Sequence, residues 1–220
     1  MQSTIEDALG RIVRQAVPVT GAGRTDAGVN ARMMVAHIDL PDGFNPDATF
    51  LRSLNALCGH DIAIHDIRPV APDAHARFDA TSRTYRYMVH TAKDPFVGEL
   101  SWQAPPTLDF DAMNAAAATL IGRRDFTSFS KLHTDVKTNI CDLREARWID
   151  LGEGRRAFEI TADRFLRNMV RAVVGTLVDV GRGKLTVDCL AAILQAKDRC
   201  AAGTSMPPGP LFLWNITYPY

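Results

Sequence analysis

The chain has 220 residues, with 25 lysines and arginines balanced by 25 aspartates and glutamates, so it can bury a sizeable core in one large or two small domains and has no formal net charge. It holds no apolar stretch long enough to span a bilayer and no secretion-signal pattern at its start, which predicts a cytoplasmic protein without membrane contact. The four cysteines are scattered without the spacing of metal ligands, so we expect reduced thiols and no metal site.

The first 91 residues are predicted to form an α/β domain. Hydrophobic periodicity predicts, in chain order, a helix from Ser3, strands at 17–20 and 33–40, a helix at 50–57, and strands at 62–67 and 84–89. Ser3 and Glu6 have the spacing of a capping box at the start of the first helix. A glycine-rich loop then joins the first two strands of this domain.

Residues 92–108 contain Pro95, Pro105 and Pro106 with little periodicity, and we expect them to connect the two halves of the chain. Residues 109–220 are predicted to form a second α/β domain. Its expected elements are a helix at 109–121, strands at 139–150 and 156–162, helices at 166–180 and 186–195, and a closing strand at 211–218. Helices alternating with antiparallel strands in both halves indicate an α+β fold of two subdomains packed side by side.

The loop Gly21–Ala31, with the sequence GAGRTDAGVNA, places one carboxylate, Asp26, beside a fixed cation, Arg24. Its glycines permit close approach of the backbone to a ligand. The neighbouring guanidinium favours the ionised form of Asp26, which is the form that can act as a nucleophile. The alternative is an ordinary polar hairpin loop, which the short motif G-x-G-R-x-D by itself would favour.

Arginines and aromatic residues alternate in the segment 76–87, with the sequence ARFDATSRTYRY. The period of a β-strand puts Arg83, Tyr85 and Tyr87 on one face and Arg86 on the other. This pattern suits RNA, because bases stack on aromatic rings and phosphates form ion pairs with arginine. An R-x-Y-x-Y strand taken alone is more often plain sheet packing.

A second basic segment, RFLRNMVR at 164–171, opens a predicted helix. Arg164, Arg167 and Arg171 are three and four residues apart, so they share one helical face. Arg171 has apolar neighbours and is a candidate for a partly buried charge that needs a partner. A solvated basic face is the alternative. Clusters of cations here and on the predicted strand allow a basic groove for nucleic acid despite the zero net charge.

Two further segments stand out by composition. DFTSF at 125–129 can be read as a helix-ending loop with two phenylalanines in the core. KDR at 197–199 is followed by AGTS at 202–205 and by PGPLFL at 208–213. Together with the three segments above, and in matching order, they resemble the tRNA pseudouridine synthase A family.

The resemblance implies the pseudouridine synthase fold, in which two α/β, RNP-like subdomains carry antiparallel sheets that flank a central cleft. The family's N-terminal strand has no counterpart in this sequence, so we expect it to be missing. Asn30 stands where the family commonly has histidine, and Pro210 stands where it has glycine. Proline fixes φ and lacks a backbone donor, so it constrains how the residue after it is placed.

The resemblance also assigns roles to residues. It implies that Asp26 is the nucleophile, attacking either C1′ of the ribose or C6 of the base, and that Arg171 pairs with it while Arg24 adds a second cation. Tyr85 is expected to stack on the target uridine, and Leu211 to pack against its other side. The remaining expected contacts are Thr25 with the substrate, and Arg77, Arg83, Arg86, Arg164 and Arg167 with RNA phosphates.

The implied reaction is isomerisation of uridine to pseudouridine at positions 38 to 40 in the anticodon stem-loop of tRNA. The resemblance further implies a homodimer that needs no cofactor and binds tRNA rather than DNA. Two alternatives stay open. The first is a non-catalytic RNA-binding module, and the second is a small-molecule enzyme whose glycine loop cradles phosphate, which the lack of a P-loop lysine disfavours.

Overall fold

The computed structural model describes residues 1–131 and 138–220. The chain forms two compact units. We call them the N-terminal unit, made of Met1–Arg24 and Val35–Ala80, and the sheet unit, made of Thr25–Met34 and Thr81–Tyr220. Along the part of the chain that the structure describes, no helix is long and apolar enough to cross a membrane.

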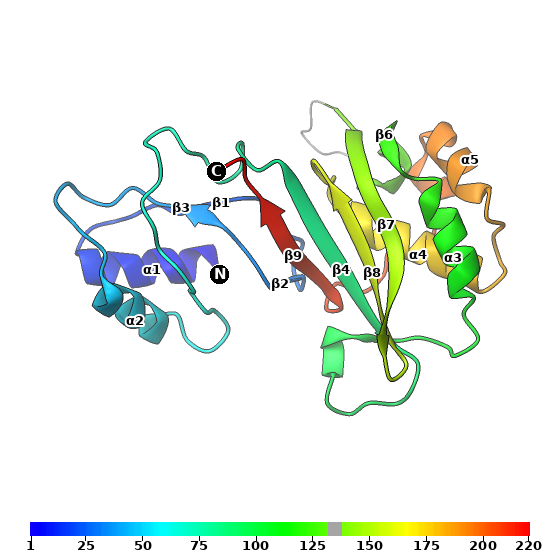
Figure 1. The fold of residues 1–220 in the computed structure, drawn as a ribbon, viewed down its shortest axis with the longest axis horizontal. Coiled ribbons are helices and arrows are strands. Elements are labelled where there is room, and N and C mark those ends of the chain that lie inside the picture. The colour runs from blue at the N-terminus through cyan, green and yellow to red at the C-terminus, as the bar shows by residue number, and fades with distance from the viewer. Residues whose placement is uncertain (132–137) are drawn as a thin grey trace. The chain divides into compact units, whose positions relative to one another are not determined.

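The N-terminal unit consists of two helices and a short two-stranded sheet (Figure 1). Its elements are α1 (Gln2–Val13), β1 (Thr20–Gly21), β3 (Ala36–His37) and α2 (Ala48–Leu57), and β1 pairs with β3 antiparallel. The helices pack through buried apolar residues that include Leu9, Phe50 and Leu54. The side chain of Asp47 begins α2 by accepting a hydrogen bond from the Phe50 amide at 2.8 Å.

Two expectations for this unit are wrong. The helix α1 begins after Met1 without a side-chain cap, and the Glu6 carboxylate accepts hydrogen bonds from Gln2 and from the Val19 amide in place of the expected capping box. Residues 62–67, all of them described, form no strand, because the main chain of Ile64 is hydrogen-bonded to the side chain of Asn55. Their isoleucines still pack against the apolar cluster, which explains the strand-like pattern.

The sheet unit contains the remaining elements. They are β2 (Asn30–Ala31), β4 (Ser82–His90), η1 (Gly98–Leu100), β5 (Trp102–Gln103), α3 (Phe110–Ala118), β6 (Gly122–Asp125), η2 (Thr127–Phe129), β7 (Ile140–Gly152), β8 (Arg155–Ala162), α4 (Met169–Gly181), α5 (Cys189–Ala196), η3 (Arg199–Ala201) and β9 (Leu211–Thr217). The long strands and helices expected from periodicity are therefore confirmed, with ends shifted by a few residues.

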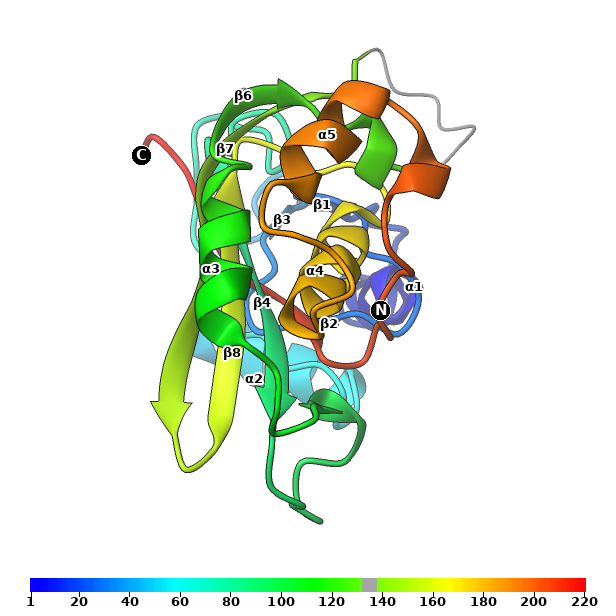
Figure 2. The ribbon, with the colours of Figure 1, turned by 90° about the vertical axis from the view of Figure 1, so that its right-hand side faces the viewer.

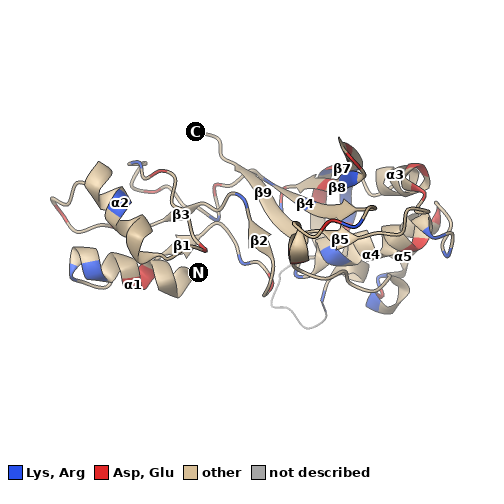
Figure 3. Cartoon of the chain, turned by 90° about the horizontal axis from the view of Figure 1, so that it is seen from below, with Lys and Arg blue, Asp and Glu red and all other residues tan. Residues whose placement is uncertain are grey.

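The strands form one sheet in the order β2-β9-β4-β8-β7-β6, with β5 beside β4. Its long neighbours are antiparallel, while β2 runs parallel to β9. Figures 1 and 2 show α3, α4 and α5 on one face of this sheet. Figure 3 shows basic and acidic residues interspersed along β7 and β8, in keeping with ion pairs such as that of Arg147 with Glu145. The α+β class is thus confirmed.

The strand β4 explains why the units differ from the division expected at 92–108. It lies between β8 and β9 in the sheet, so it belongs with the second half of the chain although it comes from the first. The residues 25–34 join the same unit because β2 pairs with β9. Pairing between strands far apart in sequence leaves no local pattern, and periodicity alone does not reveal it.

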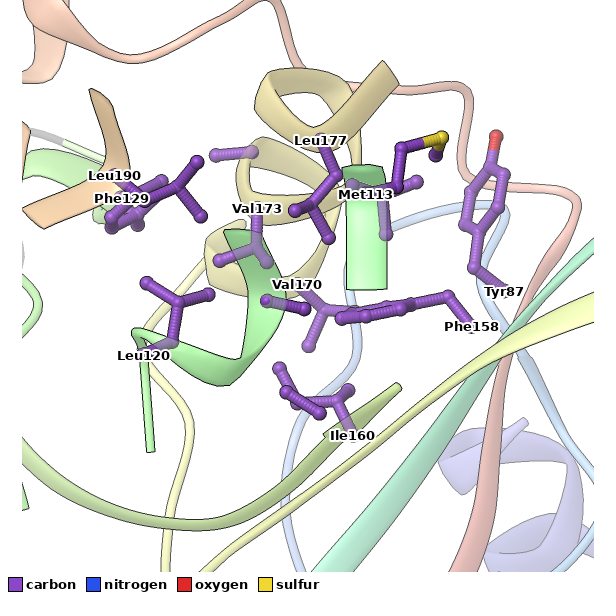
Figure 4. Close-up of a cluster of buried hydrophobic side chains, with 14 of the residues drawn as sticks. Tyr87, Met113, Leu120, Phe129, Phe158, Ile160, Val170, Val173, Leu177 and Leu190 are labelled. Atoms are coloured by element: carbon purple, nitrogen blue, oxygen red, sulfur yellow. The ribbon is translucent and has the colours of Figure 1, made fainter. Parts of the chain in front are cut away.

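The core of the sheet unit lies between the sheet and its helices (Figure 4). Phe158 and Ile160 point from β8 toward Val170, Val173 and Leu177 of α4, and all five are buried. The two phenylalanines of the DFTSF segment are also fully buried, as the structural reading of that segment predicted. This packing fixes the N-terminal end of α4, where the basic segment 164–171 ends.

Candidate active site

The turn that carries Asp26 is held within the sheet unit. The Val29 amide donates to the Asp26 carbonyl at 3.1 Å, and Gly28 has a φ of 81°, a conformation that glycine adopts without strain. Asn30 then anchors the turn, because its Nδ2 donates to the Gly209 carbonyl at 2.7 Å. Asn30 also begins β2, which pairs with β9. The residue that departs from the family pattern is therefore a structural anchor here.

Two arginines from the segment 164–171 meet the Asp26 carboxylate. Arg171 Nη1 lies 3.4 Å from Oδ2, and Arg167 Nε lies 3.7 Å from Oδ1. The side chains of Asp26 and Arg171 are only 22% and 20% exposed, whereas that of Arg167 is 60% exposed. Arg171 is therefore the interior partner of the carboxylate, and Arg167 is its solvent-facing partner.

Arg171 is fixed before any substrate binds. Its Nε donates to the Met206 carbonyl at 2.6 Å, and the Met206 amide donates back to the Arg171 carbonyl at 3.1 Å. Val170 and Ala172 beside it are buried, so the guanidinium emerges from an apolar helix face. A cation in this setting needs its partners within the protein, and Asp26 together with the Met206 carbonyl supplies them.

Tyr85 lies on β4, in the same unit as Asp26. Its ring contacts Phe165 edge to face, with centroids 5.1 Å apart and planes at 85°. Burial raises the pKa of Tyr85 to about 12, with a smaller lowering by Arg83 and a smaller raising by Asp26. Arg83 is held in place by a 2.9 Å hydrogen bond from Nη1 to the Asp163 carbonyl.

Leu211 begins β9 and is 4% exposed. In the antiparallel register it stands opposite Tyr87, two residues along β4 from Tyr85. Pro210 is compatible with this placement. Proline lacks a backbone N–H but keeps its carbonyl, and the pairing with β4 uses that carbonyl, which accepts a hydrogen bond from the Met88 amide at 2.9 Å. Burial also raises the pKa of Tyr87, and nearby Arg171 partly offsets this.

The other predicted site residues lie in different surroundings. Arg86 is on the opposite face of β4, where its Nε donates to Glu159 at 2.6 Å and its guanidinium stacks over Trp214. Arg24 and Arg77 belong to the N-terminal unit, and both are exposed. The half-buried Thr25 directly precedes Asp26 in the sheet unit.

Comparison with known proteins decides the family. Residues 116–219 match the family model described as tRNA pseudouridine synthase. The tRNA pseudouridine synthase A of Parabacteroides distasonis is 55% identical over 219 residues, covering 100% of this chain and 86% of its own length. The chain belongs to the tRNA pseudouridine synthase A family. This confirms the resemblance seen in the sequence.

Other members of the tRNA pseudouridine synthase A family match along the same span. The Porphyromonas gingivalis protein is 55% identical over 221 residues, covering 100% of this chain and 88% of its own length. The Bacillus subtilis protein is 38% identical over 222 residues, covering 99% and 89%. Both carry the name tRNA pseudouridine synthase A.

Sequence reasoning missed three features of this family member's site. Arg167, expected to contact phosphate, also lies beside Asp26. Phe165 was not singled out, although it packs on Tyr85. The Met206 carbonyl left no signal, because any residue can supply a main-chain acceptor. The helical face expected to be shared by Arg164, Arg167 and Arg171 is wrong, because α4 begins at Met169 and, of the three, only Arg171 lies in it. No helical spacing therefore places Arg167 at this carboxylate.

Proposed function

We propose that the chain isomerises uridine to pseudouridine in tRNA, at positions 38 to 40 of the anticodon stem-loop, with Asp26 as the nucleophile. The observation that carries this proposal is the Asp26 carboxylate held between Arg167 and Arg171 in a member of the tRNA pseudouridine synthase A family. The two cations orient the carboxylate in a partly buried site, and a positioned carboxylate is what a nucleophile requires.

The reaction breaks one bond and forms another without redox change. The glycosidic bond between C1′ and N1 is cleaved, the uracil turns, and C5 is joined to C1′. The proton leaves C5 and N1 ends protonated, so atoms and charge balance. Asp26 attacks either C1′ or C6 and is released when the new bond is complete.

Arg171 sets the geometry of the nucleophile. Its Nε is occupied by the Met206 carbonyl and its Nη1 faces Asp26 Oδ2, so the guanidinium cannot turn away without losing a hydrogen bond. Preorganised charges of this kind cost no reorganisation during the reaction. Arg24, two residues before Asp26 in the chain, contributes a further cation to the loop.

Tyr85 and Leu211 form two walls for the target base. A uridine within a stem must leave the base stack before its C5 and C1′ can be reached, and an aromatic wall offsets part of the lost stacking. With a pKa of about 12, Tyr85 stays protonated at neutral pH and offers the base a neutral ring. Thr25 contacts the substrate from the Asp26 loop.

The remaining cations serve the RNA backbone. Arg77, Arg83, Arg164 and Arg167 contact phosphates, so tRNA affinity falls as salt rises. Arg86 is the weakest member of the expected set, because Glu159 already holds its guanidinium. The active form is a cytoplasmic homodimer that needs no cofactor, as the family resemblance implies.

Tritium release tests the proposal directly. The purified protein is incubated with an unmodified tRNA transcript that carries tritium at uracil C5, and the tritium released to water is counted. We expect release from the wild type and none from Asp26→Ala or Asp26→Asn. A transcript whose uridines at positions 38 to 40 are replaced by cytidines is the matched control for position.

Each outcome separates the readings. Release that survives Asp26→Ala refutes Asp26 as the nucleophile. Release from the cytidine-substituted transcript refutes the position. A wild type that binds the tRNA without releasing tritium indicates the non-catalytic RNA-binding module. Absence of both binding and release refutes the RNA reading.

A further inference from the structure

Arg199 folds the segment 199–206 around its own guanidinium. This segment follows α5 and ends just before the turn that leads into β9. Arg199 Nη1 donates to the carbonyls of Ala202 and Gly203 at 3.3 and 3.2 Å, and Nη2 donates to Ser205 Oγ at 2.9 Å. One side chain thus satisfies acceptors along the whole loop, and the loop's shape depends on it.

The folded segment is fastened to helix α4. Ser205 Oγ also accepts a hydrogen bond from Asn168 Nδ2 at 2.6 Å, and Asn168, with a φ of 66°, is the N-cap residue directly before α4. Further along, the Gly203 amide donates to Thr176 Oγ1 at 2.9 Å. Gly175 permits this approach, because a Cβ there would lie 1.8 Å from the Thr204 carbonyl oxygen.

The last residue of the segment, Met206, holds Arg171. Its carbonyl accepts Arg171 Nε at 2.6 Å, and Arg171 Nη1 then faces Asp26. The Met206 side chain is buried, so the carbonyl cannot swing out without exposing apolar surface. A displacement of the segment therefore displaces the cation that orients the nucleophile.

The start of the segment is fixed as well. Lys197 Nζ lies 3.0 Å from Asp125 Oδ2, and Asp125 Oδ1 accepts the amide and the hydroxyl of Thr127. Thr127 belongs to the DFTSF segment, whose Ser128 donates to the Ile193 carbonyl of α5 at 2.5 Å. The DFTSF segment at 125–129 is thus connected, through Lys197 and α5, to the segment 199–206 that positions Arg171.

We propose that Arg199 is a positioning residue for the reaction. It touches neither the nucleophile nor the base; it acts through Ser205 and Met206 on Arg171, and so on the geometry of Asp26. The proposal rests on the proposed function. Misplacing a reacting group by about 1 Å can cost about 100-fold in rate, so a support outside the site can govern the chemical step.

A merely structural role predicts a different pattern. Loss of packing alone lowers the folded fraction or weakens tRNA binding, and leaves the rate of correctly folded, saturated enzyme unchanged. A positioning role lowers the single-turnover rate at saturating tRNA and leaves the tRNA dissociation constant unchanged. It also predicts partial rescue by lysine at position 199, which keeps one charged donor but loses the fork that reaches both the carbonyls and Ser205.

The test compares Arg199→Ala, Arg199→Lys and Ser205→Ala with the wild type by single-turnover tritium release at saturating tRNA, with dissociation constants from filter binding. We expect a loss of about 100-fold for Arg199→Ala and smaller losses for the other two variants, at unchanged affinity. Arg124→Ala is the matched control, because the Arg124 Nε hydrogen bond goes to the Ile121 carbonyl at 3.1 Å and not to the segment 199–206, and we expect this variant to keep the wild-type rate.

Thermal unfolding confirms that each variant is folded at the assay temperature, and if Arg199→Ala is not, Arg199→Lys and Ser205→Ala carry the test. Wild-type rates in the folded variants overturn the proposal, as does a loss confined to tRNA affinity. A loss of equal size in Arg124→Ala also overturns it. Failure of the wild type to release tritium is a different result, because it refutes the proposed function and the positioning role falls with it.

Discussion

Arg171 and Asp26 lie 145 residues apart in sequence, yet Nη1 of one is 3.4 Å from Oδ2 of the other, and both side chains are mostly buried. The pair joins a short loop to a long helix within the same unit. Arg171 also donates a hydrogen bond to the Met206 carbonyl. Replacing either partner therefore leaves a desolvated polar group without its hydrogen bond, which costs more than the pair contributes.

A double-mutant cycle measures this coupling. We expect Arg171→Met to lower the free energy of unfolding by about 2 kcal/mol, because it leaves Asp26 and the Met206 carbonyl without their donor. In the background of Asp26→Asn the cost falls by about 1 kcal/mol, since no unpaired charge remains. Urea unfolding provides both numbers.

The same cycle with Arg167→Met is the control. Arg167 is 60% exposed and its Nε lies 3.7 Å from Asp26, so solvent screens the pair and we expect a coupling below about 0.5 kcal/mol. Equal couplings for the two arginines would contradict the assignment of Arg171 as the interior partner.

The two faces of β4 predict different roles for its neighbouring cations. Arg86 is held by Glu159, whose side chain is 11% exposed, while Arg167 faces solvent beside Asp26. We expect Arg167→Gln to reduce the slope of log affinity for tRNA against log salt by about 0.7 to 0.9, the value of one phosphate contact. Arg86→Gln leaves that slope unchanged and lowers stability, because Glu159 loses its partner. Filter binding from low to moderate salt measures the slopes, and a reduced slope in Arg86→Gln would contradict this assignment.

Local patterns predicted what depends on local sequence. The apolar stripe of α4 and the alternation in β4 fix which residues face the core, so the positions of Arg171 and Tyr85 on their elements could be read directly. The pairing of Asp26 with Arg171 followed from a family resemblance, since no periodicity relates a loop to a distant helix. The positions of Arg171 and Tyr85 read from local patterns agree with the roles that the family resemblance gives them, as expected of a site built on a helix and a strand.

The rest depends on pairings that the sequence does not encode locally. Residues 62–67 alternate like a strand, but the main chain of Ile64 is hydrogen-bonded to the side chain of Asn55 and not to another strand. The apolar spacing therefore indicated which residues are buried, and not which conformation the main chain adopts. The position of β4 between β8 and β9 moved the unit boundary away from the proline-rich stretch. The hydrogen bond from Arg171 to Met206 uses a main-chain carbonyl, which any residue has, so the sequence gives no sign of it.

Tyr85 provides a pH-dependent prediction. Burial raises its pKa from 10.0 to about 12, so the folded state disfavours the phenolate. The stabilising contribution is fully present below the ordinary pKa and is lost as the pH rises through about 12. We expect the difference in absorbance between wild type and Tyr85→Phe at 295 nm, a wavelength where phenolate absorbs, to titrate near that value.

The unfolding free energy provides the second readout for Tyr85. Between neutral pH and the ordinary tyrosine pKa, wild type and Tyr85→Phe should change in parallel. At higher pH the wild type should lose stability faster than Tyr85→Phe, because only in the wild type does the phenol at position 85 ionise in the unfolded state before it ionises in the folded state. A phenol that titrates near its ordinary pKa would show that the ring is solvated, and it would remove this partly buried wall from the proposed base site.

Gly175 tests how closely the segment 199–206 must approach α4. A Cβ at Gly175 would lie 1.8 Å from the Thr204 carbonyl oxygen, a main-chain atom, so Gly175→Ala forces the segment off the helix and loosens the Met206 carbonyl from Arg171. We expect a loss of about 1 to 3 kcal/mol in urea unfolding together with a lower single-turnover rate. The matched control is Gly10→Ala inside α1, where the nearest atom is at an ordinary 3.6 Å, and helix propensity predicts a gain of up to about 1 kcal/mol. Wild-type stability in Gly175→Ala would mean that the segment yields without consequence, and the contact with α4 would then lose its place in the support of Arg171.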